Sequence, residues 1–288
     1  MGAKQRVGGP VVRTLYKFYK LFGYKSVHFS LYFVVLYYFL FAKNVRVALK
    51  DYYKRIGFEF TNKKYFRHLF IYALATSDRF ISKANPEIYT FENKNRAPLL
   101  EEIKNGSILL LNHFGGWATA SNYFLDSNTK INVVMNEAMI KNASDFEQLI
   151  DKKNEDCVNI IDLSKGNIST SISIGNALLE NESVAFMGDR ALNDKYIYPV
   201  KFFGEEAYFN KNPFLIAYKT KKPIIAIFVV FNKIRNYEMK FEKIEIDYEL
   251  SQEEALNQAI NKYVLILSNT LIQHPLQWFN FYNFWEKK

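Results

Sequence analysis

The stretch SILLLNHFGGWATAS, residues 107–121, contains the pattern that decides the fold class. It begins with a short apolar run that ends at polar residues and is followed by a segment with helical spacing. Such a run is typical of a buried strand. The same pattern returns three times along the chain, in INVVM (131–135), SVAFMG (183–188) and PIIAIFVVF (223–231). These four runs predict the central strands of one sheet.

Segments with helical spacing lie between these strands: WATASNYFL (117–125), DFEQLIDKK (145–153), ISTSISIGNALLEN (168–181) and NPFLIAYKTK (212–221). Strands that alternate with helices predict an α/β domain whose central, largely parallel or mixed sheet is covered by helices on both faces. Further along, YEMKFEKIEIDYE (237–249) alternates like a strand near the sheet edge. Residues 251–274 predict an amphipathic helix that begins at a capping box of Ser251 and Glu254.

The composition is that of a globular protein. Of the 288 residues, 49% are hydrophobic and 17% aromatic, with only 12 Gly and 7 Pro, which excludes a disordered or collagen-like chain. This length allows one large α/β domain or two small ones. The single cysteine, Cys157, excludes a disulfide framework and a cysteine-based zinc site, and it predicts a reducing compartment.

The positive charge of the chain is concentrated at its beginning. The formal net charge is +9, but residues 1–68 hold 14 Lys or Arg against the two acids Asp51 and Glu59, which is +12, so residues 69–288 carry −3. A segment of this charge is attracted to an anionic surface, either a nucleic acid or a membrane leaflet.

An uncharged, aromatic stretch within this segment favours the membrane. HFSLYFVVLYYFLFA, residues 28–42, is shorter than the roughly 20 apolar residues of a spanning helix and is rich in Tyr, which prefers the membrane interface. It also lacks the small-residue cleavage site of a secretory signal. We therefore predict that residues 1–68 form a helical, membrane-associating segment and that residues 69–288 form the α/β domain. The alternative is a buried helix of an ordinary core with solvated basic flanks.

His113 is the first candidate for chemistry, because it directly follows the predicted strand of the opening stretch. In open α/β sheets, ligands bind at the carboxyl ends of the strands. A histidine there can take a proton from an acceptor hydroxyl. Gly115 and Gly116 follow it and allow backbone or ligand to come close. The alternative is a structural histidine at a turn.

Four motifs in order, NHFGGWA, SVAFMGDR, KFFGEEAYFNKNPFLIAYKTKKPII and HPLQWFNFYNFW, resemble the bacterial lipid A late acyltransferase (lauroyl/myristoyl acyltransferase) family of the lysophospholipid acyltransferase superfamily. The resemblance covers residues 107–285, and YFRHLFIYALATSDR before them is similar to the membrane-associated lead of that family. It implies transfer of a fatty acyl chain from acyl carrier protein or coenzyme A to a hydroxyl or amine of a glycolipid or other polar lipid. The implied location is the cytoplasmic face of the bacterial inner membrane.

The first motif departs from the family pattern at one position. In the family, a Glu or Asp five residues after the histidine orients its ring, but this sequence has Ala118 there. Asp189, at the end of another predicted strand, is the first candidate to replace that acid, and Glu137 is a weaker second. We expect an Asp189 oxygen about 2.6–3.2 Å from the imidazole of His113, and we expect the pairing to raise the histidine pKa. The alternative for Asp189 is an ion pair with a neighbouring basic residue.

Other residues in the motifs have expected binding roles. Arg190 suits a phosphate of the acceptor or the donor, or else a structural salt bridge. Lys201 and Lys211 meet phosphates or are solvated, and Asn212 is a ligand or a helix N-cap. In KFFGEEAYF, Gly204 permits a tight turn, whereas the aromatic residues line an acyl channel or belong to the core: Phe202, Phe203 and Phe209.

No cofactor or metal is expected. The four histidines, His28, His68, His113 and His274, lack metal-site spacing, and the sequence has no phosphate-binding glycine loop and no G-x-S-x-G nucleophile motif. Direct transfer between two bound substrates is the predicted mechanism. The alternatives are a catalytically altered family member that binds lipid or acyl carrier protein, and a basic nucleic-acid-binding protein, which is the least favoured.

Overall fold

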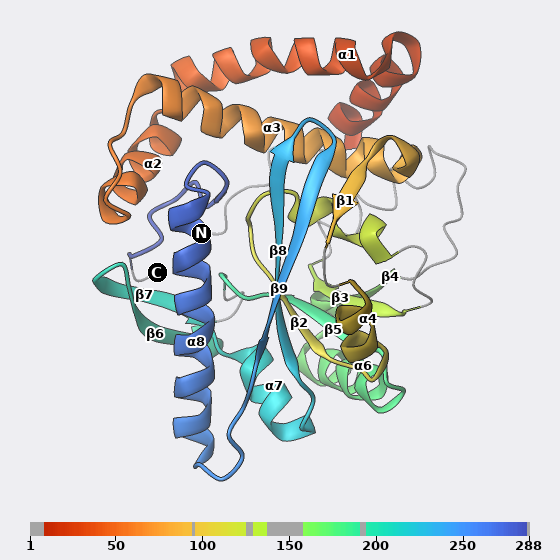
Figure 1. Cartoon of the computed structure of the whole chain (residues 1–288), viewed down its shortest axis with the longest axis vertical. Coiled ribbons are helices and arrows are strands. Elements are labelled where there is room, and N and C mark those ends of the chain that lie inside the picture. Colours follow the sequence, from red (N-terminus) through yellow and green to blue (C-terminus); the bar gives the residue numbers. More distant parts are fainter. Residues whose placement is uncertain (1–8, 94–95, 125–128, 137–157, 191–193, 287–288) are drawn as a thin grey trace.

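The computed structural model describes residues 9–93, 96–124, 129–136, 158–190 and 194–286. Within these residues, seven strands form one sheet in the order β1, β9, β8, β2, β5, β3, β4 (Figure 1). The run from β8 to β4 is parallel, β9 is antiparallel to β8, and β1 is parallel to β9. This confirms the predicted α/β class with a mostly parallel sheet. The strands are β1 (Thr90–Glu92), β2 (Ile108–Leu111), β3 (Ile131–Met135), β4 (Val158–Asp162), β5 (Ser183–Met187), β8 (Ile224–Lys233) and β9 (Asn236–Ile244).

Helices cover both faces of the sheet, because the central strands are apolar on both sides. Ile108 and Leu110 of β2 pack with α6, α7 and α8, whereas Leu109 packs on the opposite face with α4 and η2. The segment predicted as a helix after His113 is the 3₁₀ helix η2 rather than an α-helix. These elements are α4 (Arg96–Lys104), η2 (Trp117–Phe124), α6 (Asn167–Leu179), α7 (Asn212–Thr220) and α8 (Gln252–Gln273), with short 3₁₀ turns η1 (Pro86–Ile88), η3 (Leu163–Lys165) and η4 (Asp194–Tyr196).

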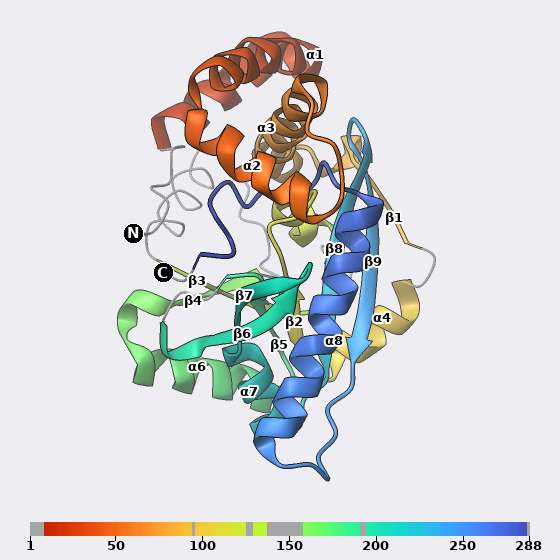
Figure 2. The ribbon, with the colours of Figure 1, turned by 90° about the vertical axis from the view of Figure 1, so that its left-hand side faces the viewer.

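A separate hairpin packs beside α8 (Figure 2). Its strands are β6 (Ile197–Phe202) and β7 (Glu205–Asn210), which pair antiparallel. Phe203 and Gly204 form its turn with φ of 51° and 87°. Two positive φ values are typical of the two-residue hairpin turn that suits the twist of the strands. Gly204 therefore has the turn role that the sequence predicts.

Three helices lie across the end of the sheet where β8 ends (Figures 1 and 2). They are α1 (Gly9–Phe41), which is bent at Gly23, α2 (Lys43–Arg55) and α3 (Asn62–Ala84). The rings of Tyr52, Tyr53 and Tyr65 are almost fully buried in the same hydrophobic core as the sheet. Helix α3 also continues through residue 68, where the sequence places a domain boundary. Much of the basic segment is therefore built into the fold.

A buried carboxylate joins these helices to the sheet. Asp78 of α3 is fully buried and accepts hydrogen bonds from Tyr24 in α1 (3.0 Å), Tyr89 after η1 (2.8 Å) and Tyr237 in β9 (2.6 Å). Burial raises the pKa of Asp78 to about 6, although the three tyrosine hydroxyls and Arg235 oppose this shift.

Taken singly, no helix among the described residues has the length and apolar composition needed to cross a membrane. Helices α1 and α2 meet that requirement only when they are taken as a pair, and they are bent by 84° where they meet.

Candidate active site

His113 and Asp189 meet at the carboxyl edge of the sheet. His113 follows β2 and Asp189 follows β5, and these strands are parallel neighbours in which Leu111 pairs with Met187. His113 Nδ1 lies 2.9 Å from Asp189 Oδ1, inside the range expected from the sequence. The contact predicted for Asp189 is thus present, whereas Glu137, the second candidate, lies outside the described residues.

Four hydrogen bonds hold the Asp189 carboxylate, whose side chain is fully buried. Oδ1 accepts from the His113 ring, and Oδ2 accepts from the His113 backbone N–H at 3.0 Å. The indole N–H of Trp278 and the side-chain amide of Asn280 donate to the same Oδ2, at 3.1 and 3.0 Å. Because every donor fixes a direction, the carboxylate plane is locked with Oδ1 toward the imidazole.

The donors Trp278 and Asn280 come from a tail segment, residues 277–285, to which the sequence analysis assigns no role. This segment pairs with the chain around His113: Phe279 N–H donates to His113 O at 2.7 Å, and Gly115 N–H donates to Gln277 O at 2.8 Å. The motif HPLQWFNFYNFW is the only signal in the sequence that points to this segment. Residues 277–285 contain no histidine and no carboxylate, so none of them is a candidate base.

The tail segment also connects the site to α3. His68, fully buried in α3, has its Nε2 at 2.9 Å from Trp278 O and its Nδ1 at 3.2 Å from Tyr53 OH. The ring of Phe279 lies between Tyr72 of α3 and Trp117, with centroid distances of 5.2 and 5.7 Å. The N-terminal helices therefore pack directly against the segment that holds the site.

The electrostatics of the pair favour an ionised Asp189 and a neutral His113. Burial alone would raise the pKa of Asp189, but the hydrogen bonds from His113, the charge of His113 when it is protonated in acid, and the charge of Arg190 hold this pKa well below its usual range. The pKa of His113 is lowered, because burial disfavours the imidazolium more than Asp189 favours it, and Arg190 adds to the lowering. The pairing with Asp189 raises the pKa of His113, as expected, but burial outweighs the pairing, so the net shift is downward.

This charge distribution fixes the histidine tautomer. An ionised carboxylate only accepts hydrogen bonds, so Nδ1 of a neutral His113 carries the proton that Asp189 receives. The lone pair then lies on Nε2, and among the described residues no hydrogen bond reaches that atom. The side chain is 18% exposed. His113 thus presents a free basic nitrogen at the edge of the sheet.

Arg190 is held by the tail segment. Its Nε donates to Asn280 Oδ1 at 2.6 Å, its Nη2 donates to Phe279 O at 3.2 Å, and the Tyr282 ring lies 5.1 Å from the guanidinium carbon. Within the described residues it forms no ion pair at salt-bridge distance, so the salt-bridge alternative is not seen there. A phosphate-binding role for Arg190 stays a prediction.

The two glycines after His113 serve packing within the protein. A Cβ at Gly115 would lie 1.9 Å from Val229 O of β8, and one at Gly116 would lie 2.4 Å from the Tyr237 ring. Their backbone N–H groups donate to Gln277 O and Val229 O. The groups that come close to these two glycines, as predicted, therefore belong to other segments of the protein.

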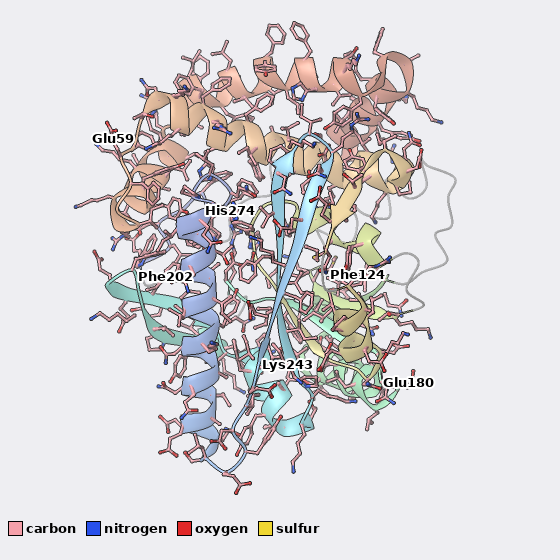
Figure 3. The ribbon with its side chains drawn as sticks, viewed as in Figure 1. Glu59, Phe124, Glu180, Phe202, Lys243 and His274 are labelled. Atoms are coloured by element: carbon pink, nitrogen blue, oxygen red, sulfur yellow. The ribbon has the colours of Figure 1, made fainter. Side chains whose placement is uncertain are left out.

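The acceptor-side residues are distributed between core and surface. Phe202, marked in Figure 3, and Phe209 are fully buried, which agrees with the core alternative, and Phe202 packs against Trp278 at 5.8 Å between ring centroids. Phe203 is half-buried in the hairpin turn, and Lys201 is exposed on β6. Their substrate roles stay predictions.

Asn212 is not the N-cap of α7. It is the first residue of the helix, and its backbone N–H donates to Asn210 Oδ1 at 3.1 Å, so Asn210 satisfies this helix end in its place. The side chain of Asn212 is half-buried. In the parts of the chain that the structure describes, no group of three or more potential metal ligands occurs.

Residues 70–287 match the family described as bacterial lipid A biosynthesis acyltransferase. A search among curated proteins finds no match. The matched region contains the whole sheet and every residue of the site around His113 and Asp189. Because the match spans well over half of the chain, the protein belongs to the bacterial lipid A biosynthesis acyltransferase family and is an acyltransferase of that general type.

Proposed function

We propose that the protein transfers a fatty acyl chain from a thioester, carried by acyl carrier protein or coenzyme A, to a hydroxyl or amine of a glycolipid or other polar lipid. His113 is the general base and Asp189 orients it. The observation that carries this proposal is the 2.9 Å contact between His113 Nδ1 and the buried Asp189 carboxylate, which accepts four hydrogen bonds. This contact leaves Nε2 of His113 as the basic atom.

The reaction needs no covalent enzyme intermediate. The acceptor oxygen attacks the thioester carbonyl carbon while His113 Nε2 takes the hydroxyl proton. Asp189 stabilises the imidazolium that forms. When the tetrahedral intermediate collapses, the carbon–sulfur bond breaks and the imidazolium returns its proton to the leaving thiolate. The products are an ester and a free thiol, and the histidine is neutral again.

We further propose that α1 rests on the cytoplasmic leaflet of the inner membrane. Its inner face is formed by Val27, Leu31 and Val35, each at most 6% exposed. Its outer face carries side chains that are 58–63% exposed at helical spacing: Phe29, Phe33, Tyr37 and Leu40. Figure 3 shows ring-bearing side chains that project from α1 away from the sheet. Aromatic groups at this density suit the interfacial region of a bilayer.

The N-terminal helices also carry exposed basic side chains. They lie on α1, α2 and α3 and suit anionic headgroups, at about 1 kcal/mol each near the surface: Arg13, Lys17, Lys20, Lys25, Lys43, Lys50, Lys54, Lys63 and Arg67. The site sits beneath the same helices, through the contacts of α3 with the tail segment. This arrangement supports an acceptor that reaches His113 from the membrane.

Substitution of the base tests the function. His113→Gln keeps size and hydrogen bonding but cannot take the proton, so release of free thiol from a long-chain acyl thioester in the presence of membrane lipid should fall to background. His28→Gln on α1 is the matched control and should transfer normally. Full transfer by His113→Gln would refute the base. A wild-type protein that binds the thioester without consuming it would support the binding-protein alternative.

A further inference from the structure

Asn280 stands between the two charged side chains of the site. Its amide nitrogen donates to Asp189 Oδ2 at 3.0 Å, and its amide oxygen accepts from Arg190 Nε at 2.6 Å. The residue is 3% exposed. It is therefore a buried neutral bridge that joins an anion to a cation.

The chemistry of its neighbours leaves only one orientation for this amide. A guanidinium has donors and no acceptor, so the atom facing Arg190 must be the oxygen. An ionised carboxylate has acceptors and no donor, so the atom facing Asp189 must be the NH₂ group. The short planar amide of Asn offers the acceptor and the donor on two separate atoms, one for each charged neighbour. A carboxylate at position 280 would face Asp189 as a like charge.

The bridge acts on the base through Asp189. Oδ2 already receives the His113 backbone N–H and the Trp278 indole, and Asn280 supplies its third donor. These three donors saturate Oδ2 and leave Oδ1 for the His113 ring. Losing the amide removes one of the three donors to Oδ2 and one of the hydrogen bonds that hold Arg190, so both side chains are less firmly oriented.

We propose that Asn280 is a positioning residue for acyl transfer, which sets the orientation of Asp189 and, through it, of the His113 ring. This inference rests on the proposed function of His113. It assigns the tail segment a part in the reaction without any contact with substrate.

The test compares three variants by steady-state kinetics and by NMR titration of the His113 ring. Asn280→Asp is nearly isosteric and adds a negative charge beside Asp189, so the pKa of His113 should rise and kcat should fall by about 10²-fold, the cost of a misplacement near 1 Å. KM should change little. Asn280→Ser should lower kcat in the same way without the added charge. Asn283→Asp is the control, because Asn283 is exposed in the same segment, and it should change neither quantity.

A purely structural role for Asn280 would lower the melting temperature of the uncharged variant Asn280→Ser and leave the His113 pKa and kcat of that folded variant unchanged, and that result overturns the proposal. If Asn280→Asp does not fold, kcat of Asn280→Ser decides, with an unchanged value overturning it. Failure of the proposed function looks different: His113→Gln would remain active while the His113 pKa still responds to Asn280→Asp.

Discussion

The charge of Asp189 is the first property to test at the scale of single residues. Asp189→Asn keeps the shape but removes the anion that holds the Nδ1–H tautomer of His113. In a Ser-His-Asp site the same change costs about 10⁴-fold in rate, and we expect a loss of 10²- to 10⁴-fold in kcat here. The loss in kcat would be measured from the free thiol released at timed intervals. A variant within threefold of the wild type would show that the carboxylate has no part in transfer.

Asp189→Asn should also lower stability at neutral pH. The pKa of Asp189 is depressed in the folded protein, so the ionised group stabilises the fold above its unfolded pKa of about 3.9, and this contribution is lost as pH falls toward the folded value. The melting temperatures of wild type and variant should therefore converge in acid. Equal differences at pH 7 and pH 3 would contradict this.

The pH dependence of transfer follows from the lowered pKa of His113. The base is neutral above its pKa, and burial moves that pKa below the ordinary value of about 6.5. The acid limb of kcat/KM should therefore have a midpoint below pH 6.5, with full activity at pH 7. A midpoint above pH 7 would mean that Asp189 outweighs burial.

The sequence predicts His113 and Asp189 because both follow apolar runs, and the ends of parallel neighbours meet at one edge. It does not predict Trp278 and Asn280, which reach Asp189 only after the tail segment has docked. It predicts that Asp189 raises the pKa of His113 but not that burial lowers this pKa more, because the desolvation of a ring depends on what packs around it. The local sequence pattern therefore predicts the reacting pair, whereas the residues that hold the pair in place are determined by tertiary packing.

At the scale of elements, the turn from β2 into η2 depends on two glycines. Gly115→Ala would place a Cβ 1.9 Å from the backbone oxygen of Val229, which cannot move aside, at a φ of 53°. We expect this clash to cost about 1–3 kcal/mol in the free energy of unfolding, measured in urea, in addition to the backbone strain of the positive φ. Gly57→Ala is the matched control, since it also has positive φ but nothing within 4 Å, and it should cost only about 1–2 kcal/mol of backbone strain. Equal losses would contradict the steric argument.

The contact between α3 and β9 should make stability depend on pH. The pKa of Asp78 is about 6 in the folded protein and about 3.9 unfolded, so between these values the folded state keeps a proton that the unfolded state has lost. Stability from this group therefore falls as pH rises, by about 3 kcal/mol in total. Asp78→Asn removes that slope. The difference in unfolding free energy between the wild type and Asp78→Asn should therefore change in favour of the variant by this amount from pH 4 to pH 7. A difference that is the same at both pH values would refute the assignment.

The elements that the sequence misses share a physical cause. Strand β4 lies at the sheet edge, where two of its five residues are exposed, so it lacks the continuous apolar run of a buried strand. Each strand of the β6–β7 hairpin has two exposed residues, and the turn has Phe rather than Asn before Gly204. The helix predicted at 145–153 lies outside the described residues. The central strands are found because they are buried on both faces.

For the whole molecule, the main question is how it meets the membrane. Removing residues 1–68 would also remove buried core residues such as Tyr53 and Tyr65, so point variants are the better test. Phe29→Ser with Phe33→Ser should lower flotation with anionic vesicles without loss of fold. Ile168→Ser is the control, because Ile168 is 80% exposed on α6, away from α1, and should float as the wild type does.

Binding should also weaken as salt rises, because exposed charges are screened over about 8 Å at physiological ionic strength. Some attachment should remain in high salt through the aromatic face. Flotation that responds neither to salt nor to the two phenylalanines would rule out α1 as the contact.

The position of the tail segment in the chain also decides when the site can form during synthesis. The ribosome adds residues in order, so the strands that carry His113 and Asp189 exist before residues 277–280 do. Until these dock, the carboxylate lacks the donors Trp278 and Asn280, and its burial is unfavourable. We therefore expect a nascent chain to hold much of its sheet with an unfinished catalytic pair, and to gain its base only after translation has passed the tail segment.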